Sequence, residues 1–156
     1  MTQQRIANLI AVVGTGAYTG VMIAIGLGLG RYWLSLDPAD FEAWFTPNFW
    51  YLLPTVLSTL PWALIGTVWS LSIAWRTPAR RAWLTVLALI GVTLVVTAGY
   101  HLPANIRIWS GELTAAQLES ELGWWLVAHV ARVGFALAGA VAGFLASTAG
   151  QGTDTP

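Results

Sequence analysis

The sequence predicts an all-α fold: a membrane-spanning four-helix bundle of up-down topology that forms a single domain. Composition is the first observation behind this prediction, because 56% of the 156 residues are hydrophobic and only 9% are charged. A soluble domain carries roughly a quarter of its residues as charges, so this chain has too few to cover a water-soluble surface. The second observation is four long apolar stretches, each with the roughly 20 residues that a helix needs to cross a bilayer core.

The four spans are predicted over residues 6–30, 50–75, 82–100 and 122–146. They are joined by an outer loop over 31–49, a short turn over 76–81 and a second outer loop over 101–121, and a flexible tail follows over 147–156. The first three spans contain no charged residue, whereas the fourth is interrupted by His129 and Arg132. Four spans with such connections favour an up-down bundle.

The arginines predict the orientation of the bundle, since the cytoplasmic side of a membrane protein carries an excess of basic residues. One end of the predicted bundle holds four of them, and the other end holds two: Arg5, Arg76, Arg80 and Arg81 against Arg31 and Arg107. We therefore expect a multi-pass protein of the cell membrane with both termini and the turn over 76–81 in the cytoplasm.

Tryptophans are expected at both membrane interfaces, because the indole ring is apolar while its N–H needs a polar partner. At the inner interface these are Trp75 and Trp83, and at the outer interface they are Trp33, Trp50, Trp124 and Trp125.

Three GxxxG pairs predict where the helices touch, since small residues let helix backbones approach closely in a membrane. The pairs are Gly16–Gly20, Gly26–Gly30 and Gly139–Gly143. The first pair belongs to VVGTGAYTG at 12–20, a segment that also looks like a dinucleotide-binding fingerprint. That fingerprint requires a preceding strand and a βαβ unit, and an uncharged membrane span provides neither. We therefore interpret these glycines as helix-packing residues.

Two counts exclude whole classes of function. The chain has no cysteine, which excludes disulfides, thiolate metal sites and iron–sulfur clusters. Seven basic and seven acidic residues give a formal net charge of +0, so no basic surface for nucleic acid is predicted.

The informative side chains are those that are costly inside a bilayer. A charge near the bilayer centre costs about 2.5–3.5 kcal/mol on insertion scales and usually faces the bundle interior. Arg132 is the only charge well inside a span, and His129 lies one helical turn before it. Helical spacing places Trp125, Gly139 and Gly143 on the same stripe. Because the glycines are expected to contact another helix, His129 and Arg132 are expected to point into the same interface.

Further polar residues are predicted near the outer ends of the second and third spans. His101 closes the third span in the sequence HLPAN, where Pro103 disfavours a helical Leu102 and is expected to end or kink the helix. The polar residues expected to line an outer-leaflet pocket with tryptophan are His101, Asn105, Thr97 and Thr59. Such a pocket between helices is the default binding site in a bundle.

Each of these residues also has a purely structural interpretation. Arg132 could extend its long stem to the headgroups, and His129 could be a hydrogen-bonded packing residue. His101 could be solvated at the interface, and Asn105 could be a turn residue or a helix cap. Thr114 and Gln117 are expected to form a capping box that starts the last helix, with Glu119 and Glu121 in its first turns.

The stretch over 101–146 resembles the anthrone oxygenase family, which consists of small membrane proteins with four spans. The resemblance is carried by HLPAN at 101–105 and by the pattern WxxxHxxR at 125–132. In the first half of the chain, the glycine-rich first span and DPADF at 37–41 fit the family in outline. Family members often place a proline directly after the first span, and residues 31–34 contain none.

The resemblance implies oxidation of an anthrone to an anthraquinone with O₂ and without a cofactor, so the implied partners are a flat hydrophobic phenolic molecule and O₂. A neutral histidine suits the removal of a proton near neutral pH, and a fixed guanidinium suits an enolate oxygen. The implied catalytic residues are His129 as base, Arg132 as anion stabiliser and His101 as an orienting partner. Asn105 would also orient the substrate, and Trp125 would stack on its ring system.

Two alternatives to an oxygenase stay open. His101 and His129, on adjacent spans, could be ligands of a b-type haem or of a copper ion. The chain could instead be an accessory subunit of a larger membrane complex, or a homo-oligomer, in which the polar stripe holds an interface together.

Overall fold

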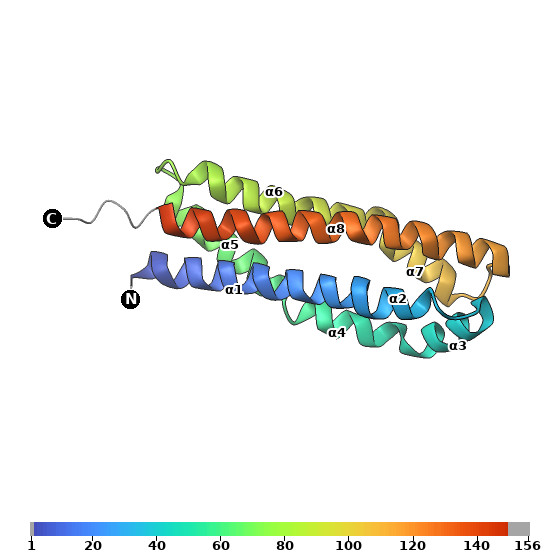
Figure 1. Ribbon diagram of the computed structural model, residues 1–156. Helices are drawn as coiled ribbons and strands as arrows, with labels where there is room; N and C mark the ends of the chain where they lie inside the picture. The colour runs from blue at the N-terminus through green and yellow to red at the C-terminus, as the bar shows by residue number, and fades with distance from the viewer. Residues whose placement is uncertain (1, 150–156) are drawn as a thin grey trace.

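The computed structural model describes residues 2–149, and in this part of the chain all regular structure is helical. The elements in order are α1 (Gln3–Ile23), the π-helix η1 (Ala24–Leu29), α2 (Gly30–Trp33), α3 (Pro38–Asn48), the 3₁₀ turn η2 (Phe49–Tyr51), α4 (Leu52–Leu57), α5 (Leu60–Ala74), α6 (Arg80–Val96), the π-helix η3 (Thr97–His101), α7 (Leu102–Trp109) and α8 (Ala115–Ala149). These elements line up end to end into an elongated bundle (Figure 1).

Four helical stretches are long and apolar enough to cross a membrane: Gln3–Trp33, Pro38–Ala74, Arg80–Trp109 and Ala115–Thr148. They alternate in direction, so α1 begins and α8 ends at the same end of the bundle (Figure 1). The prediction of an all-α, four-helix membrane bundle is therefore confirmed. We call the end that carries α2, α3 and α7 the distal end.

The two predicted outer loops are largely helical, which corrects the expected boundaries. Most of 31–49 belongs to α2 and α3, and α3 begins with Pro38 in its first turn, where a missing N–H costs no hydrogen bond. Most of 101–121 belongs to α7 and the start of α8. The expected tail also begins later, since α8 includes 147–149; the remaining tail residues, 150–156, lie outside the described residues.

The sequence predicts that the third helix ends or kinks near Pro103, and the structure shows that it does not end there. Leu102 keeps helical angles (φ −66°, ψ −48°) before Pro103, and the π-helix η3 immediately precedes α7, with the proline at the start of that helix. A π-helical turn changes the hydrogen-bond register from i−4 to i−5. The irregularity that Pro103 indicates is therefore a π-helical turn inside a continuing helix.

Two of the three GxxxG pairs contact a neighbouring helix. A Cβ atom added to Gly26 would lie 2.8 Å from His129 Cδ2, and one added to Gly30 would lie 2.5 Å from Leu126 Cδ2. Gly139 and Gly143 are buried, as the predicted stripe on the fourth span requires. Gly16 and Gly20, in contrast, are exposed and have no neighbouring atoms within 4 Å of an added Cβ.

The closest helix contact near the start of the chain is made by two glycines outside these motifs. A Cβ atom on Gly14 would lie 2.5 Å from the backbone nitrogen of Ala63, and one on Gly66 would collide with the backbone of Ala11. The contact is reciprocal, because each glycine admits the backbone of the other helix. It joins α1 to α5 with almost no side-chain layer between them.

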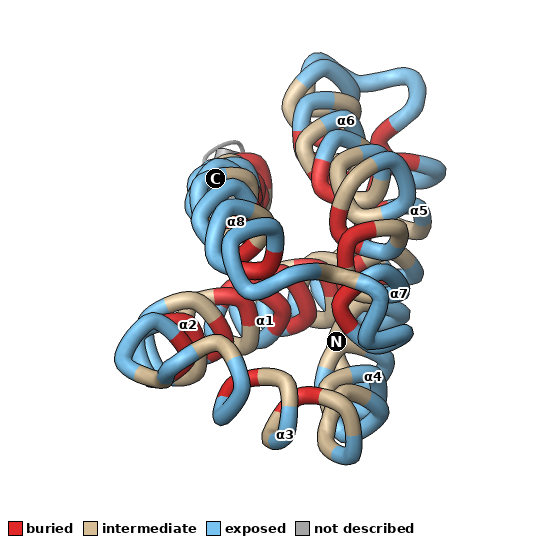
Figure 2. Tube along the Cα trace, turned by 90° about the vertical axis from the view of Figure 1, so that its right-hand side faces the viewer, coloured by how far each residue is buried: buried red, intermediate tan, exposed pale blue. Residues whose placement is uncertain are grey.

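The tryptophans expected at the two interfaces differ in how far the bundle buries them. Trp33 and Trp83 are 1% exposed and Trp125 is similarly enclosed, while Trp75, Trp50 and Trp124 are half exposed or more. Trp33 makes edge contacts with Phe41, Phe45 and Trp125. These rings close the distal end of the bundle, and Figure 2 shows the buried positions of the helices turned toward its centre.

Candidate functional site

A cavity of about 250 Å³ lies in the distal half of the bundle, and we call it the pocket. Its walls come from the end of α1 with η1, from η2 with α4, from η3 with α7, and from α8. Most of its lining is apolar. The lining residues that the sequence analysis had singled out are Thr97, His101, Asn105, Trp125, His129 and Arg132.

Thr59 is the one predicted site residue that the structure places elsewhere. It borders a different cavity, next to Gly14 of α1 and Trp62 of α5. The reason is a break in the second span: α4 ends at Leu57, and Thr59 has φ −119° before α5 begins. Helical spacing is not carried across this break, so Thr59 does not face the pocket.

His129 has one ring nitrogen held by the backbone and one without a partner. Its Nε2 lies 2.8 Å from the carbonyl oxygen of Met22. A carbonyl only accepts, so Nε2 must donate, and in the neutral ring this leaves a lone pair on Nδ1. Nδ1 is buried and has no hydrogen-bond partner. The close approach depends on Gly26, which leaves room for the imidazole ring.

The second histidine has a similar arrangement on the opposite wall. His101 is the last residue of η3 and is 1% exposed. Its Nδ1 lies 3.5 Å from the carbonyl oxygen of Val96, five residues earlier, which makes a long and weak hydrogen bond. With Nδ1 as the donor, the lone pair of the neutral ring is on Nε2, which is buried without a partner. Its burial excludes the alternative of a solvated His101.

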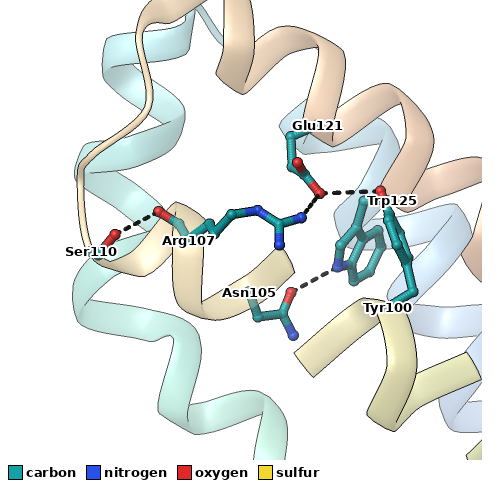
Figure 3. A network of polar contacts seen from close by, with 6 residues as sticks. All are labelled: Tyr100, Asn105, Arg107, Ser110, Glu121 and Trp125. Atoms are coloured by element: carbon teal, nitrogen blue, oxygen red, sulfur yellow. Dashed lines mark hydrogen bonds and ion pairs between the residues drawn. The ribbon is translucent and has the colours of Figure 1, made fainter. Parts of the chain in front are cut away.

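Trp125 links the two imidazole rings. Its indole stacks on His129 with centroids 4.9 Å apart and planes at 5°, and it meets His101 edge-on at 5.0 Å. The two imidazole centroids are 5.8 Å apart. Asn105 orients the indole, because its Oδ1 accepts a hydrogen bond of 2.7 Å from Trp125 Nε1 (Figure 3). Asn105 lies within α7, so it is neither a turn residue nor a cap.

Arg132 is a cation without a carboxylate partner among the described residues. It is only 5% exposed, so its side chain does not reach up to the headgroups. Its Nη2 donates to the sulfur of Met22 at 3.2 Å, a weak acceptor, and its Nε has no partner. A buried charge in this state is expensive. The pocket is therefore lined by a guanidinium whose donors are incompletely satisfied by the protein.

A separate polar network links the helices at the distal end of the bundle. Arg107 Nη2 lies 2.7 Å from Glu121 Oε1, and the Tyr100 hydroxyl donates to the same oxygen at 3.2 Å (Figure 3). This joins α7 and η3 to α8 directly beside Asn105 and Trp125. The expected capping box is confirmed by reciprocal contacts between Thr114 and Gln117. The pairing of Glu121 with Arg107 was not predicted, because the two residues are distant in sequence.

The donor atoms and the size of the pocket can be compared with what a copper ion or a haem would require. No cluster of three or more His, Cys, Asp or Glu side chains occurs within residues 2–149. The unpartnered nitrogens of His101 and His129 and the thioether of Met22 are ligand types that suit copper. Two imidazole nitrogens are also the ligand type of a b-type haem, but a porphyrin is larger than the cavity of about 250 Å³. The donor atoms thus suit either group, and the size of the cavity favours copper.

Comparison of the chain with protein-family models, with curated proteins and with solved structures found no match in any of the three. The functional interpretation therefore depends on the geometry of the pocket and on the sequence patterns.

Proposed function

We propose that this membrane protein is an oxygenase that oxidises a flat hydrophobic phenolic substrate of the anthrone type with O₂. The observation that carries the proposal is that three residues that line one apolar pocket each have a buried polar atom without a partner: His129 Nδ1, His101 Nε2 and Arg132 Nε. Unpaired buried polar atoms are costly, and a substrate with an acidic C–H and a neighbouring oxygen would satisfy them. The resemblance of 101–146 to the anthrone oxygenases supplies the reaction.

In this proposal the lone pair of His129 Nδ1 removes a proton from the methylene carbon of the substrate. The Met22 carbonyl keeps the ring in the required tautomer, because it holds the proton on Nε2. The negative charge moves to the substrate oxygen, which Arg132 stabilises in a water-poor environment where charge interactions are strong. His101 accepts a hydrogen bond from a substrate hydroxyl and so orients the ring.

The resulting enolate is electron-rich and reacts with O₂. A carbon–oxygen bond forms, and the peroxide takes up the proton that His129 holds. The hydroperoxide then loses water: the second methylene proton leaves carbon, the O–O bond breaks, and a carbonyl remains. The methylene group and O₂ thus become a carbonyl group and water, and the four electrons lost by carbon are gained by the two oxygen atoms. No net proton is consumed.

The same proposal places the protein in the cell membrane with its termini in the cytoplasm. The arginine distribution supports this orientation, since the end with Arg76, Arg80 and Arg81 is the more basic one. The pocket then lies in the outer leaflet, where an apolar substrate and O₂ both dissolve readily.

An oxygen-uptake assay tests the proposal. The purified protein should consume O₂ with anthrone above the rate of anthrone alone, and Arg132→Ala should lower this rate by about 100- to 1,000-fold, because it removes the stabiliser of the enolate charge. Arg31→Ala is the matched control, since Arg31 is exposed at the distal end and does not line the pocket. Its rate should stay within about twofold of wild type.

The outcome that contradicts an enzyme is a wild-type protein that does not accelerate O₂ uptake with any anthrone tested. The accessory-subunit interpretation would then be favoured, and co-purification of a larger membrane complex would support it.

A copper protein is the second candidate, favoured by the two unpartnered imidazole nitrogens beside Met22. Metal analysis and an absorption spectrum from 300 to 700 nm on the same purified sample distinguish the two candidates. For the oxygenase we expect less than about a tenth of an equivalent of metal and no visible band. Stoichiometric copper that is lost in both His101→Ala and His129→Ala would make the histidines ligands and would overturn the role of His129 as base.

A further inference from the structure

The pocket has a side opening whose residues face the lipid. Four of its apolar lining residues are about half exposed: Trp50 at 54%, Leu53 at 49%, Leu102 at 50% and Ile106 at 51%. Trp50 and Leu53 come from η2 and α4, while Leu102 and Ile106 come from α7. These four residues are part of the pocket wall and part of the outer surface at once, and we call them the portal.

The packing of the second span explains why the pocket opens here. Near the termini, α5 packs against both α1 and α6 and so closes this side of the bundle. Beyond the break at Ser58 and Thr59, α4 packs on α1 and α5 but is not among the segments that pack closely on η3 or α7. Farther along, α3 packs on α7, and Trp50 of η2 meets the ring of Trp109. The space without close packing is therefore confined to α4 on one side and η3 with α7 on the other, and the pocket occupies it.

The portal lies toward the distal end of two helical stretches, Pro38–Ala74 and Arg80–Trp109, that are apolar enough to span a bilayer. With the orientation proposed above, this places the portal at the outer edge of the bilayer. On the distal side, Phe49 of the pocket lining stacks on Phe45 of the ring cluster, and Asn105 is hydrogen-bonded to Trp125. Because the exposed side chains of the portal are all apolar, this opening suits a molecule that is dissolved in the lipid.

We propose that the ligand of this site is a phenol that carries an apolar chain, with its ring in the pocket and its chain in the portal. This rests on the proposed function, because it places the acidic ring at His129 and Arg132. The cavity of about 250 Å³ has room for a small ring system only. Any further apolar part of the ligand has to lie between Leu53 and Ile106, where it replaces lipid contacts with similar apolar contacts.

The test compares two naphthols with the same ring in lipid nanodiscs that contain the full chain: 2-naphthol, which has no chain, and 6-decyl-2-naphthol. Binding is measured with radiolabelled ligands, and empty nanodiscs correct for partition into lipid. The double variant Leu53→Trp with Ile106→Trp fills the portal. It should weaken binding of the decyl compound at least tenfold and should leave binding of 2-naphthol within about twofold of wild type.

The control is Val130→Trp with Leu137→Trp, two exposed positions on α8 that do not line the pocket. It should bind both compounds as wild type does. Retained binding of 2-naphthol also shows that the portal variant is folded.

The two proposals fail in different ways. If 2-naphthol binds and Arg132→Ala abolishes this binding, but the decyl compound does not bind or is unaffected by the filled portal, the chain-bearing ligand is wrong and the ring site stands. If 2-naphthol does not bind to wild type, or binds equally well to Arg132→Ala, the ring site itself is wrong, and both proposals are overturned.

Discussion

His129→Gln is expected to lower the rate of O₂-dependent anthrone oxidation by about 100- to 10,000-fold, the usual contribution of a positioned general base. Glutamine is the informative substitution because its amide nitrogen can replace Nε2 as the donor to the Met22 carbonyl. It offers no basic nitrogen in place of Nδ1. The variant therefore keeps the helix contact and removes the proton acceptor. We expect the thermal unfolding temperature and the binding of 2-naphthol to stay close to wild type while turnover is lost.

The comparison with His101→Gln assigns the base. His101 is proposed to orient the substrate, so its loss should weaken binding and lower the rate by less than the loss of His129 does. A variant His129→Gln that keeps more than half of the wild-type rate would show that another group removes the proton. If His101→Gln were then the inactive variant, the roles of the two histidines would have to be exchanged.

Gly66→Ala is expected to have the largest effect on stability in this chain. Its added Cβ would collide with backbone atoms of Ala11 and Ile10, which cannot move as a flexible side chain does. Overpacking of this kind costs about 1–3 kcal/mol or more, and here it would push α1 and α5 apart along their tightest contact. Gly14→Ala should behave in the same way, because it faces the backbone of Trp62 and Ala63. Thermal unfolding in a mild detergent, followed by circular dichroism, measures the effect.

Gly16→Ala is the matched control for this prediction. It lies on the same helix, two residues from Gly14, but an added Cβ would have no neighbour within 4 Å. Because alanine favours a helix over glycine by about 1 kcal/mol, this variant should be slightly more stable than wild type. Equal destabilisation by Gly16→Ala and Gly66→Ala would contradict the backbone contact between α1 and α5.

The sequence predicts the number of spans well because the length of an apolar stretch reflects the thickness of the bilayer. It is less informative about the segments between the spans. The region 31–49 contains Asp37, Asp40 and Glu42, and its composition predicts a loop, yet α3 forms there. Pro38 starts this helix, and Phe41 and Phe45 lie one turn apart and pack together against Trp33. This helix is recognisable only once the ring cluster at the distal end is known, and that cluster is a feature of the tertiary structure.

The predicted site residues are brought together where a single helix carries them. Trp125, His129 and Arg132 share one face of α8, and the helical period alone is sufficient to place them. Thr59 was misplaced because the break before α5 interrupts that period. Two of the three GxxxG motifs correctly predict a helix contact, because such a motif also lies within one helix. The third motif makes no helix contact. Gly14 and Gly66 form the closest contact without any motif, since a pair of glycines on different helices leaves no spacing signal in the sequence.

The structure also shows features of the site that the spacing of residues in the sequence cannot predict. Which nitrogen of each imidazole is free depends on the carbonyls of Met22 and Val96, and both contacts occur beside a π-helical segment. Neither segment was predicted, because a π-helical turn has no compositional signature as clear as the one that proline and glycine give to a helix end. The portal is unpredictable for the same reason, because it depends on where a helix break leaves α4 without close packing on η3 and α7.

The π-helices η1 and η3 each accommodate one residue more than an α-helix would over the same turn, and this has a consequence for how the pocket can arise or disappear. Removing one residue from such a turn, for example Gly28 or Gly99, both of which have free space around them, restores regular α-helical geometry. Because the π-helical turn takes up its extra residue locally, the helical segments on either side keep their register after such a deletion. Loss of one residue from a regular α-helical turn would instead rotate everything beyond it by about 100°. A single codon lost in either segment would therefore remove the local widening of the pocket wall and leave the distal half of that helix, and the other spans, in place.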